Sequence, residues 1–180
     1  MVDIKTGIVC FFDGACEPTL LAWMAGFVDG EGCLTITRQD RKNRPTPQWR
    51  PFITIANTHK QSLEIFHKQY GGTLRFNAEK RASKTGVKWS DSWTWYCQQT
   101  SVKKFCEDLL PFLVVKKEQA KILLSFINNI QTSGRLKGGR NANGTFIGSF
   151  PLPVKDIEFR NLMRDNIHSL NSGKRFKTAI

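Results

Sequence analysis

Apolar and polar residues alternate in several stretches of the chain, and this pattern predicts β-strands. In CLTITRQDR, Leu34 and Ile36 fall on one side, while threonine, glutamine and arginine fall on the other. QWRPFITIAN shows the same alternation, with Ile53 and Ile55 on its apolar side. Strands are expected at residues 33–41, 48–57, 73–77 and 88–99.

Apolar residues at helical spacing predict helices before, between and after these strands. Pro18 suits the first turn of a helix whose apolar pattern runs over residues 20–28. Another helix covers residues 59–70 and is ended by Gly71 and Gly72. Further helices are expected at residues 101–113, 116–130 and 155–170. Paired strands with helices between them predict an α+β fold with one antiparallel sheet.

The length of 180 residues fits one domain with a sizeable core. We assign residues 1–17 to an irregular N-terminal leader and residues 18–180 to a single domain. Within that domain, residues 133–148 are expected to form a basic, glycine-rich loop and residues 173–180 a basic tail.

The polar side of three predicted strands carries side chains that can read the edges of bases. The alternative is a face that is simply solvated. The candidates are Thr35, Thr37, Gln39, Arg41, Gln48, Arg50, Thr54, Arg75 and Asn77. In the fourth strand, the alternation places Trp93 and Trp95 in the core with Ser92 and Thr94 outside, although the tryptophans could also face a ligand.

The net charge of +12 favours a polyanionic partner, most often a nucleic acid. The five cysteines and three histidines form no C-x-x-C pair or zinc-ligand pattern. The odd number of cysteines indicates reduced thiols inside a cell. The run GIVCFF is too short for a signal peptide, and no stretch is long enough to span a membrane. We therefore expect an intracellular protein, cytoplasmic or organellar, that is not secreted and does not bind membranes.

The stretch LAWMAGFVDGEG combines a bulky stripe with a small one. Leucine, tryptophan, methionine and phenylalanine are expected to face the chain's own core. The small stripe lets a second helix approach closely, which would account for a helical glycine that costs roughly 1 kcal/mol against alanine. We predict a homodimer interface made by Ala22, Ala25, Gly26 and Asp29.

Acids end this same helix, against the direction of its macrodipole. If two such helices pack together, their terminal carboxylates gather, and hard divalent cations are the usual partners of such a group. The alternative is an ordinary helix end with its acids in solvent.

MAGFVDGEG, residues 24–32, resembles the signature nonapeptide of the LAGLIDADG homing endonucleases. Four positions match outright, Gly30 replaces an alanine, and Glu31 replaces the second aspartate with a longer carboxylate. ITIANTHKQSLEIFHKQYGG resembles the family's strand-to-helix segment, and LLPFLVVKKEQA its third conserved block. Together the resemblance covers roughly residues 18–130. The motif occurs once, as in the branch whose members act as homodimers.

The resemblance implies an αββαββα fold, extended here by C-terminal helices, whose antiparallel sheet forms a saddle over the major groove of double-stranded DNA. It places catalytic metal on Glu31 and the carbonyl of Gly30, with Mg²⁺ or another divalent cation such as Mn²⁺ as the ion. Asn57 and Lys116 match two further catalytic positions, although Lys116 could also be a solvated cation. A third polar pocket residue is expected within residues 59–61.

The implied function is a site-specific endonuclease that makes a double-strand break in a long pseudo-palindromic target. Each subunit would cover about 10 bp, one helical turn. Two alternatives stay open: an RNA-binding intron maturase, and a non-catalytic DNA-binding protein of the same fold.

Overall fold

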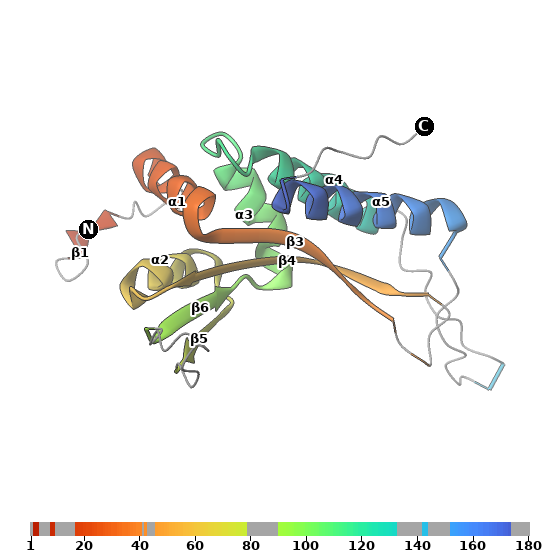
Figure 1. Ribbon diagram of the computed structural model, residues 1–180, viewed down its shortest axis with the longest axis horizontal. Helices are drawn as coiled ribbons and strands as arrows, with labels where there is room; N and C mark the ends of the chain where they lie inside the picture. The colour runs from red at the N-terminus through yellow and green to blue at the C-terminus, as the bar shows by residue number, and fades with distance from the viewer. Residues whose placement is uncertain are drawn as a thin grey trace.

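The chain forms one four-stranded antiparallel sheet with its helices packed against one face (Figure 1). The computed structural model describes residues 2–3, 8–9, 17–40, 42, 46–78, 90–132, 142–143 and 152–173. The elements of the domain are α1 (Pro18–Glu31), β3 (Gly32–Gln39), β4 (Gln48–Asn57), α2 (Lys60–Tyr70), β5 (Thr73–Asn77), β6 (Ser92–Tyr96), the 3₁₀ turn η1 (Gln99–Ser101), α3 (Val102–Leu109), α4 (Lys117–Thr132) and α5 (Val154–Asn171). The expected α+β class and the αββαββα order are confirmed.

Two short strands precede this domain. β1 (Val2–Asp3) and β2 (Ile8–Val9) pair antiparallel within the segment that the sequence indicated as an irregular leader. Arg41 lies outside the described residues, as do most of the 133–148 loop and of the 173–180 tail. Among the described residues, no helix has the length and apolar character needed to cross a membrane.

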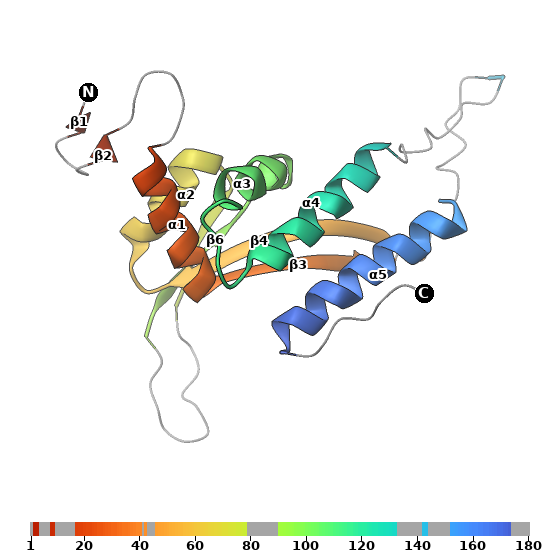
Figure 2. The same cartoon turned by 90° about the horizontal axis from the view of Figure 1, so that it is seen from above.

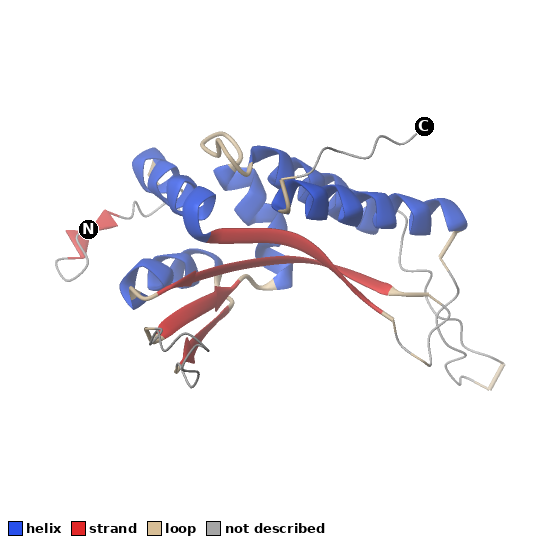
Figure 3. Cartoon of the chain, in the orientation of Figure 1, coloured by secondary structure: helices blue, strands red, loops and turns tan. Residues whose placement is uncertain are grey.

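The sheet order is β3-β4-β6-β5, so β3 and β5 form its edges. Figure 3 shows the long β3–β4 hairpin reaching beyond the shorter β5 and β6. Seen from above, α1, α3, α4 and α5 lie across the sheet (Figure 2). The helices therefore cover one face and leave the other open.

The core lies between the covered face and the helices. Phe66 of α2 lies at its centre, with ring centroids 5.8 Å from Phe27, 5.5 Å from Trp95 and 6.4 Å from Phe105. The Nε1 of Trp95 donates to the carbonyl of Gly71 at 2.8 Å. The buried face of β6 thus carries Trp95, as its alternation predicted.

Gly72 ends the α2–β5 connection at a place where a side chain does not fit. Its φ is +96°, and a Cβ there would lie 2.2 Å from the carbonyl oxygen of Tyr96. Glycine alone combines this backbone conformation with such a close approach.

Burial disfavours the thiolate form of the two buried described cysteines. Burial raises the pKa of Cys97 to about 12 and also raises the pKa of Cys106. Cys33, the third free cysteine of the described part, is exposed.

Candidate active site and nucleic-acid interface

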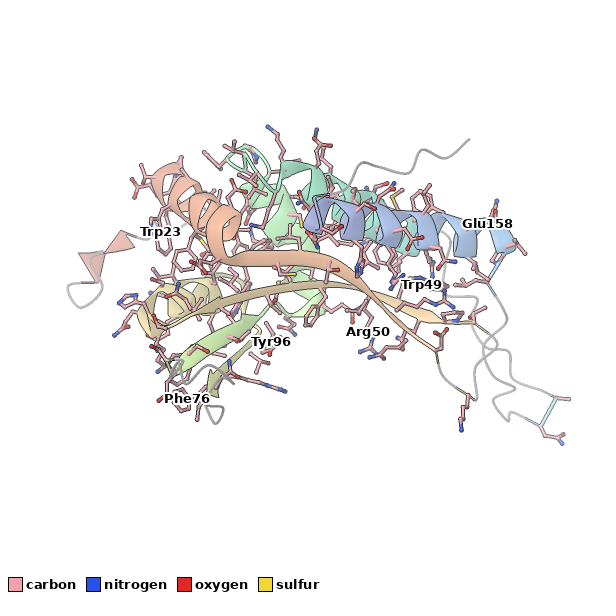
Figure 4. The ribbon with its side chains drawn as sticks, in the orientation of Figure 1. Trp23, Trp49, Arg50, Phe76, Tyr96 and Glu158 are labelled. Carbon is pink, nitrogen blue, oxygen red and sulfur yellow. The ribbon has the colours of Figure 1, made fainter. Side chains whose placement is uncertain are left out.

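The open face of the sheet collects the predicted base-reading residues. Directly paired residues of antiparallel strands point to the same side. The pairs Thr35–Phe52, Thr37–Arg50 and Gln39–Gln48 therefore share one face, to which Cys33–Thr54, Thr54–Tyr96, Thr73–Tyr96, Arg75–Thr94 and Asn77–Ser92 also belong. All eight described candidates lie there. Figure 4 shows Arg50 and Tyr96 on the side away from the helices.

Neighbours on this face hold several of its polar side chains. The guanidinium of Arg50 donates to Oε1 of Gln48 at 3.2 Å. Asn77 donates to Oγ1 of Thr94 at 2.8 Å. The Cζ of Arg75 lies 5.4 Å from the ring centre of Tyr96, within cation–π range.

The list of base-reading candidates left out part of this face. Phe52, Thr73, Thr94 and Tyr96 also lie on it, and the rings of Phe52 and Tyr96 are 5.9 Å apart. The alternation that put Trp93 and Trp95 inside already placed their neighbours outside. That signal could have found the β6 residues.

At the other end of β3, the two acids of α1 have different surroundings. The carboxylate of Asp29 accepts three backbone N–H groups: Oδ2 from Val114 at 2.8 Å and from Val115 at 3.1 Å, and Oδ1 from Lys116 at 2.8 Å. Asp29 thereby ties the end of α1 to the turn before α4. Glu31 is exposed.

Lys116 lies at the same place. Its Nζ donates to the carbonyl oxygen of Asp29, one residue before Gly30. Glu31 and Lys116, two predicted catalytic residues that are distant in sequence, thus both lie at the C-terminal end of α1. The ammonium group also complements the negative end of the helix macrodipole.

Asn57 lies at the end of β4 on the helix-covered side. Gly32 pairs with Ile55, so the strand register carries Asn57 to the level of the α1 end. Its Oδ1 accepts the backbone N–H of His59 at 2.8 Å, a turn that leads into α2. Asn57 is therefore beside the site, with its amide oxygen engaged in local structure.

The 59–61 segment begins α2. The Nδ1 of His59 lies 2.8 Å from Oγ of Ser62. Lys60 forms an ion pair with Glu64 at 2.8 Å and lies 4.8 Å from the ring centre of Trp93.

The small-residue face of α1 differs from its prediction at two positions. Ala25 is fully buried in the chain's own core, and Trp23, expected inside, is 41% exposed. The exposed small residues are Ala22, Gly26 and Gly30, four apart. A helix turns 100° per residue, so positions four apart share one side, whereas Ala25 lies towards Met24 and Val28.

Among the described residues, nothing covers this face. A Cβ added at Gly26 or Gly30 would meet no described atom within 4 Å outside the adjoining backbone of its own helix. Packing inside the subunit therefore gives no reason for glycine at either position.

The described residues contain no group of three His, Cys, Asp or Glu side chains placed to hold a metal ion. The oxygen donors at the α1 end are the Glu31 carboxylate and the Gly30 carbonyl, because three hydrogen bonds occupy Asp29. Such hard oxygens suit Mg²⁺ or Mn²⁺, which binds through one or two carboxylates together with water and phosphate oxygens.

With this geometry established, the comparisons show that the chain is similar to homing endonucleases, LAGLIDADG enzymes among them. It is 32% identical over 117 residues to the DNA endonuclease I-CvuI of Chlorella vulgaris. The aligned part is 61% of this chain and spans 64% of that protein's length. No family model matches the chain.

Solved structures show the same similarity. A crystal structure of I-CvuI with a DNA target, in the presence of 2 mM Mg and with the DNA not cleaved, has a TM-score of 0.59 and 25% identity. That match covers 90% of this chain and 87% of the other. The archaeal intron-encoded homing endonuclease I-Vdi141I, complexed with DNA, shares the fold with a TM-score of 0.60, 14% identity and 89% coverage of both chains.

Proposed function

We propose that this chain is a site-specific DNA endonuclease that cuts both strands of a long pseudo-palindromic target by divalent-metal-dependent hydrolysis. One arrangement carries the proposal. The exposed carboxylate of Glu31 and the ammonium group of Lys116, which donates to the carbonyl of Asp29, both lie at the α1 end that leads into β3 of the open-faced sheet. A protein that only binds DNA has no use for this pair. The proposal also agrees with the names of the similar proteins.

The active unit is a homodimer joined through α1. Ala22, Gly26 and Gly30 offer a flat exposed strip, and space remains above both glycines. Two such strips allow close backbone approach, as small-xxx-small helix pairs do. A two-fold axis along them brings the two Glu31 side chains together.

Glu31 and the carbonyl of Gly30 would hold the divalent ion, with Mg²⁺ as the expected metal. When bound, the ion supplies an activated water and stabilises charge on the leaving oxygen. Asp29 is not a ligand in this proposal. It holds the turn that carries Lys116, so the acid–lysine arrangement depends on it.

Lys116 is placed to stabilise negative charge that develops on the cleaved phosphate. Asn57, whose amide oxygen faces its own turn, has its NH₂ group available for a water or a phosphate oxygen. Its side chain is shorter than the glutamine common at this position in the family. We therefore expect Asn57 to contribute less to the cleavage rate than Lys116.

The open face would lie in the major groove, with arginine, glutamine, asparagine and threonine side chains towards the bases. β3 spans eight residues, about 26 Å at 3.3 Å per residue. That length is comparable to one helical turn of DNA, about 34 Å. Each subunit therefore reads about one half-site.

Incubation with a plasmid library of randomised inserts tests this function. We expect linear plasmids in Mg²⁺ whose ends map to one pseudo-palindromic sequence, and intact plasmids in EDTA. Selective retention of one sequence without cleavage in either Mg²⁺ or Mn²⁺ would make the chain a DNA-binding protein. Stimulated splicing of an intron RNA, again without DNA cleavage, would make it a maturase.

A further inference from the structure

Helix α5, which lies beyond the sequence motifs that carry the resemblance, runs along β3, an edge strand of the sheet (Figure 2). Asn171 donates to the carbonyl of Leu34 at 3.0 Å, and Nε2 of His168 lies 3.4 Å from Oγ1 of Thr35. Further along, Arg38 donates to Oδ1 of Asn161 at 3.3 Å. The helix thus contacts β3 near its beginning and again near its far end.

The far end carries a second set of contacts, which we call the Trp49 cluster: Arg38, Trp49 and Arg160. Trp49 is 4% exposed and pairs with Arg38 across the hairpin. The Cζ atoms of Arg38 and Arg160 lie 5.7 and 6.0 Å from the Trp49 ring centre. Figure 4 shows Trp49 between the hairpin and α5.

Side chains of α4 and α5 hold Arg160 in place. Its Nε donates to Oδ1 of Asn129 at 3.1 Å, and Asn129 donates to Oδ1 of Asp156 at 3.2 Å. Arg160 and Asp156 are each 8% exposed. Burial lowers the pKa of Arg160 and Asp156 opposes that effect, so the guanidinium stays charged near neutral pH. The network links the Trp49 ring to both α4 and α5.

No hydrogen bond from a described residue fixes the Trp49 ring. Its Nε1 is buried and has no hydrogen-bond partner among the described residues. The position of the ring therefore depends on the guanidinium groups and on packing.

Trp49 and Arg38 point to the covered face, and their chain neighbours point to the open face. Those neighbours are the predicted base readers Gln48 and Arg50, with Thr37 and Gln39 opposite them. A tilt of this hairpin end would move all four side chains together. Arg50 also packs against Gln48, so the two readers move as a pair.

We infer that Arg160 is a positioning residue: through Trp49 it fixes the far end of the β3–β4 hairpin and so sets discrimination at the outer base pairs of each half-site. The inference rests on the proposed function only for its DNA-binding part. The central positions, near the α1 end, fall to Arg75 and Asn77, which lie on β5 at the opposite edge of the sheet from α5.

The first test needs no DNA. Amide hydrogen exchange is compared in Arg160→Met and Arg164→Met. Both variants remove one guanidinium from α5, and Arg164 donates to Asp165 on its own helix at 3.2 Å. We expect roughly tenfold faster exchange at residues 37–39 and 48–50 in Arg160→Met, with unchanged exchange at 53–55. Equal exchange in the two variants would overturn the inference.

The second test measures affinity for target DNA with single base changes. Arg160→Met should lose about tenfold in discrimination at outer positions and nothing at central ones, while Arg164→Met keeps both. Trp49→Phe retains a ring and should keep discrimination, whereas Trp49→Leu should lose it at the outer positions. Equal loss at outer and central positions in Arg160→Met would refute the role. If the wild-type protein shows no preference for any DNA sequence, the proposed function is refuted. The hydrogen-exchange test would still decide whether Arg160 holds the hairpin end, because it involves no DNA.

Discussion

At the scale of single residues, the end of α1 shows how two carboxylates two positions apart acquire different tasks. Asp29 uses both oxygens to accept the backbone N–H groups of residues 114–116. Glu31 stays exposed. The longer side chain at position 31 still presents a carboxylate, so the departure from the family's aspartate changes its reach and not its chemistry.

Glu31→Gln should abolish cleavage and leave specific DNA binding nearly intact. The amide keeps the size of the side chain but removes the negative charge that a divalent ion requires. Single-turnover cleavage in Mg²⁺ and gel-shift affinity in Ca²⁺ measure the two properties separately. Full cleavage by the glutamine variant would show that the metal is held elsewhere.

Asp29→Ala should lower the free energy of unfolding by about 1–2 kcal/mol, the range found when capping side chains are removed. Three N–H groups lose their acceptor, and the turn that carries Lys116 is released. Urea denaturation of both variants gives the comparison. Glu64→Ala is the control, because its exposed pair with Lys60 contributes less than about 1 kcal/mol. Equal stability of the two variants would contradict the capping role.

At the scale of elements, strand faces could be predicted from the sequence better than helix faces. A strand has two sides, so one apolar set such as Leu34 and Ile36 decides the direction of every neighbour. Eight base-reading candidates were placed correctly on one face in this way. Their contact with DNA is still a prediction.

A helix does not have just two faces, so its apolar residues do not fix the direction of every neighbour. Apolar and small residues on α1 occupy overlapping arcs, and the sequence does not say where the core begins. Ala25 was therefore assigned outward, although it is fully buried. Trp23 was assigned inward, but it is 41% exposed while its ring also packs against Phe27 and Phe66. The contacts of α5 with β3 could not be predicted either, because they join residues more than 120 positions apart and follow no local pattern.

A substitution in the exposed strip of α1 tests whether this strip forms the dimer interface. Gly26→Leu should separate two packed helices by about a side-chain width and reduce both dimerisation and cleavage. A Cβ at Gly26 has space among the described residues, so the monomer should fold normally. Analytical ultracentrifugation with and without target DNA measures assembly.

Ser125→Leu on α4 is the matched control, since it also adds an exposed leucine to a helix. It should leave assembly unchanged. A wild-type protein that is monomeric on its DNA would disprove the dimer, and an unimpaired Gly26→Leu dimer would place the interface elsewhere.

At the scale of the whole molecule, charge and shape act together. The chain carries a net charge of +12, and its helices lie on one side of the sheet while the other side is polar. Under the proposed function, phosphate contacts would supply affinity that does not depend on the DNA sequence, and the open face would supply sequence preference. The two contributions respond differently to salt.

If a dimer neutralises about ten phosphates, log affinity should fall against log salt with a slope near −9, from roughly −0.9 per phosphate. Lys137→Ala, in the segment that the sequence predicts to be a basic loop, should flatten this slope equally for target and random DNA. Arg50→Ala or Arg75→Ala should weaken target binding preferentially, by about 1–3 kcal/mol for each bidentate arginine–base pairing that the substitution removes. Lys121→Ala, on the helix side and paired with Glu118, is the control that should change neither the salt slope nor the preference for target DNA.

Because two-fold symmetry repeats every interaction, each arginine should map to two mirrored base positions. Affinities for singly substituted targets decide the matter: if both arginine variants lose target and random DNA to the same degree, the open face is an electrostatic platform that does not read bases.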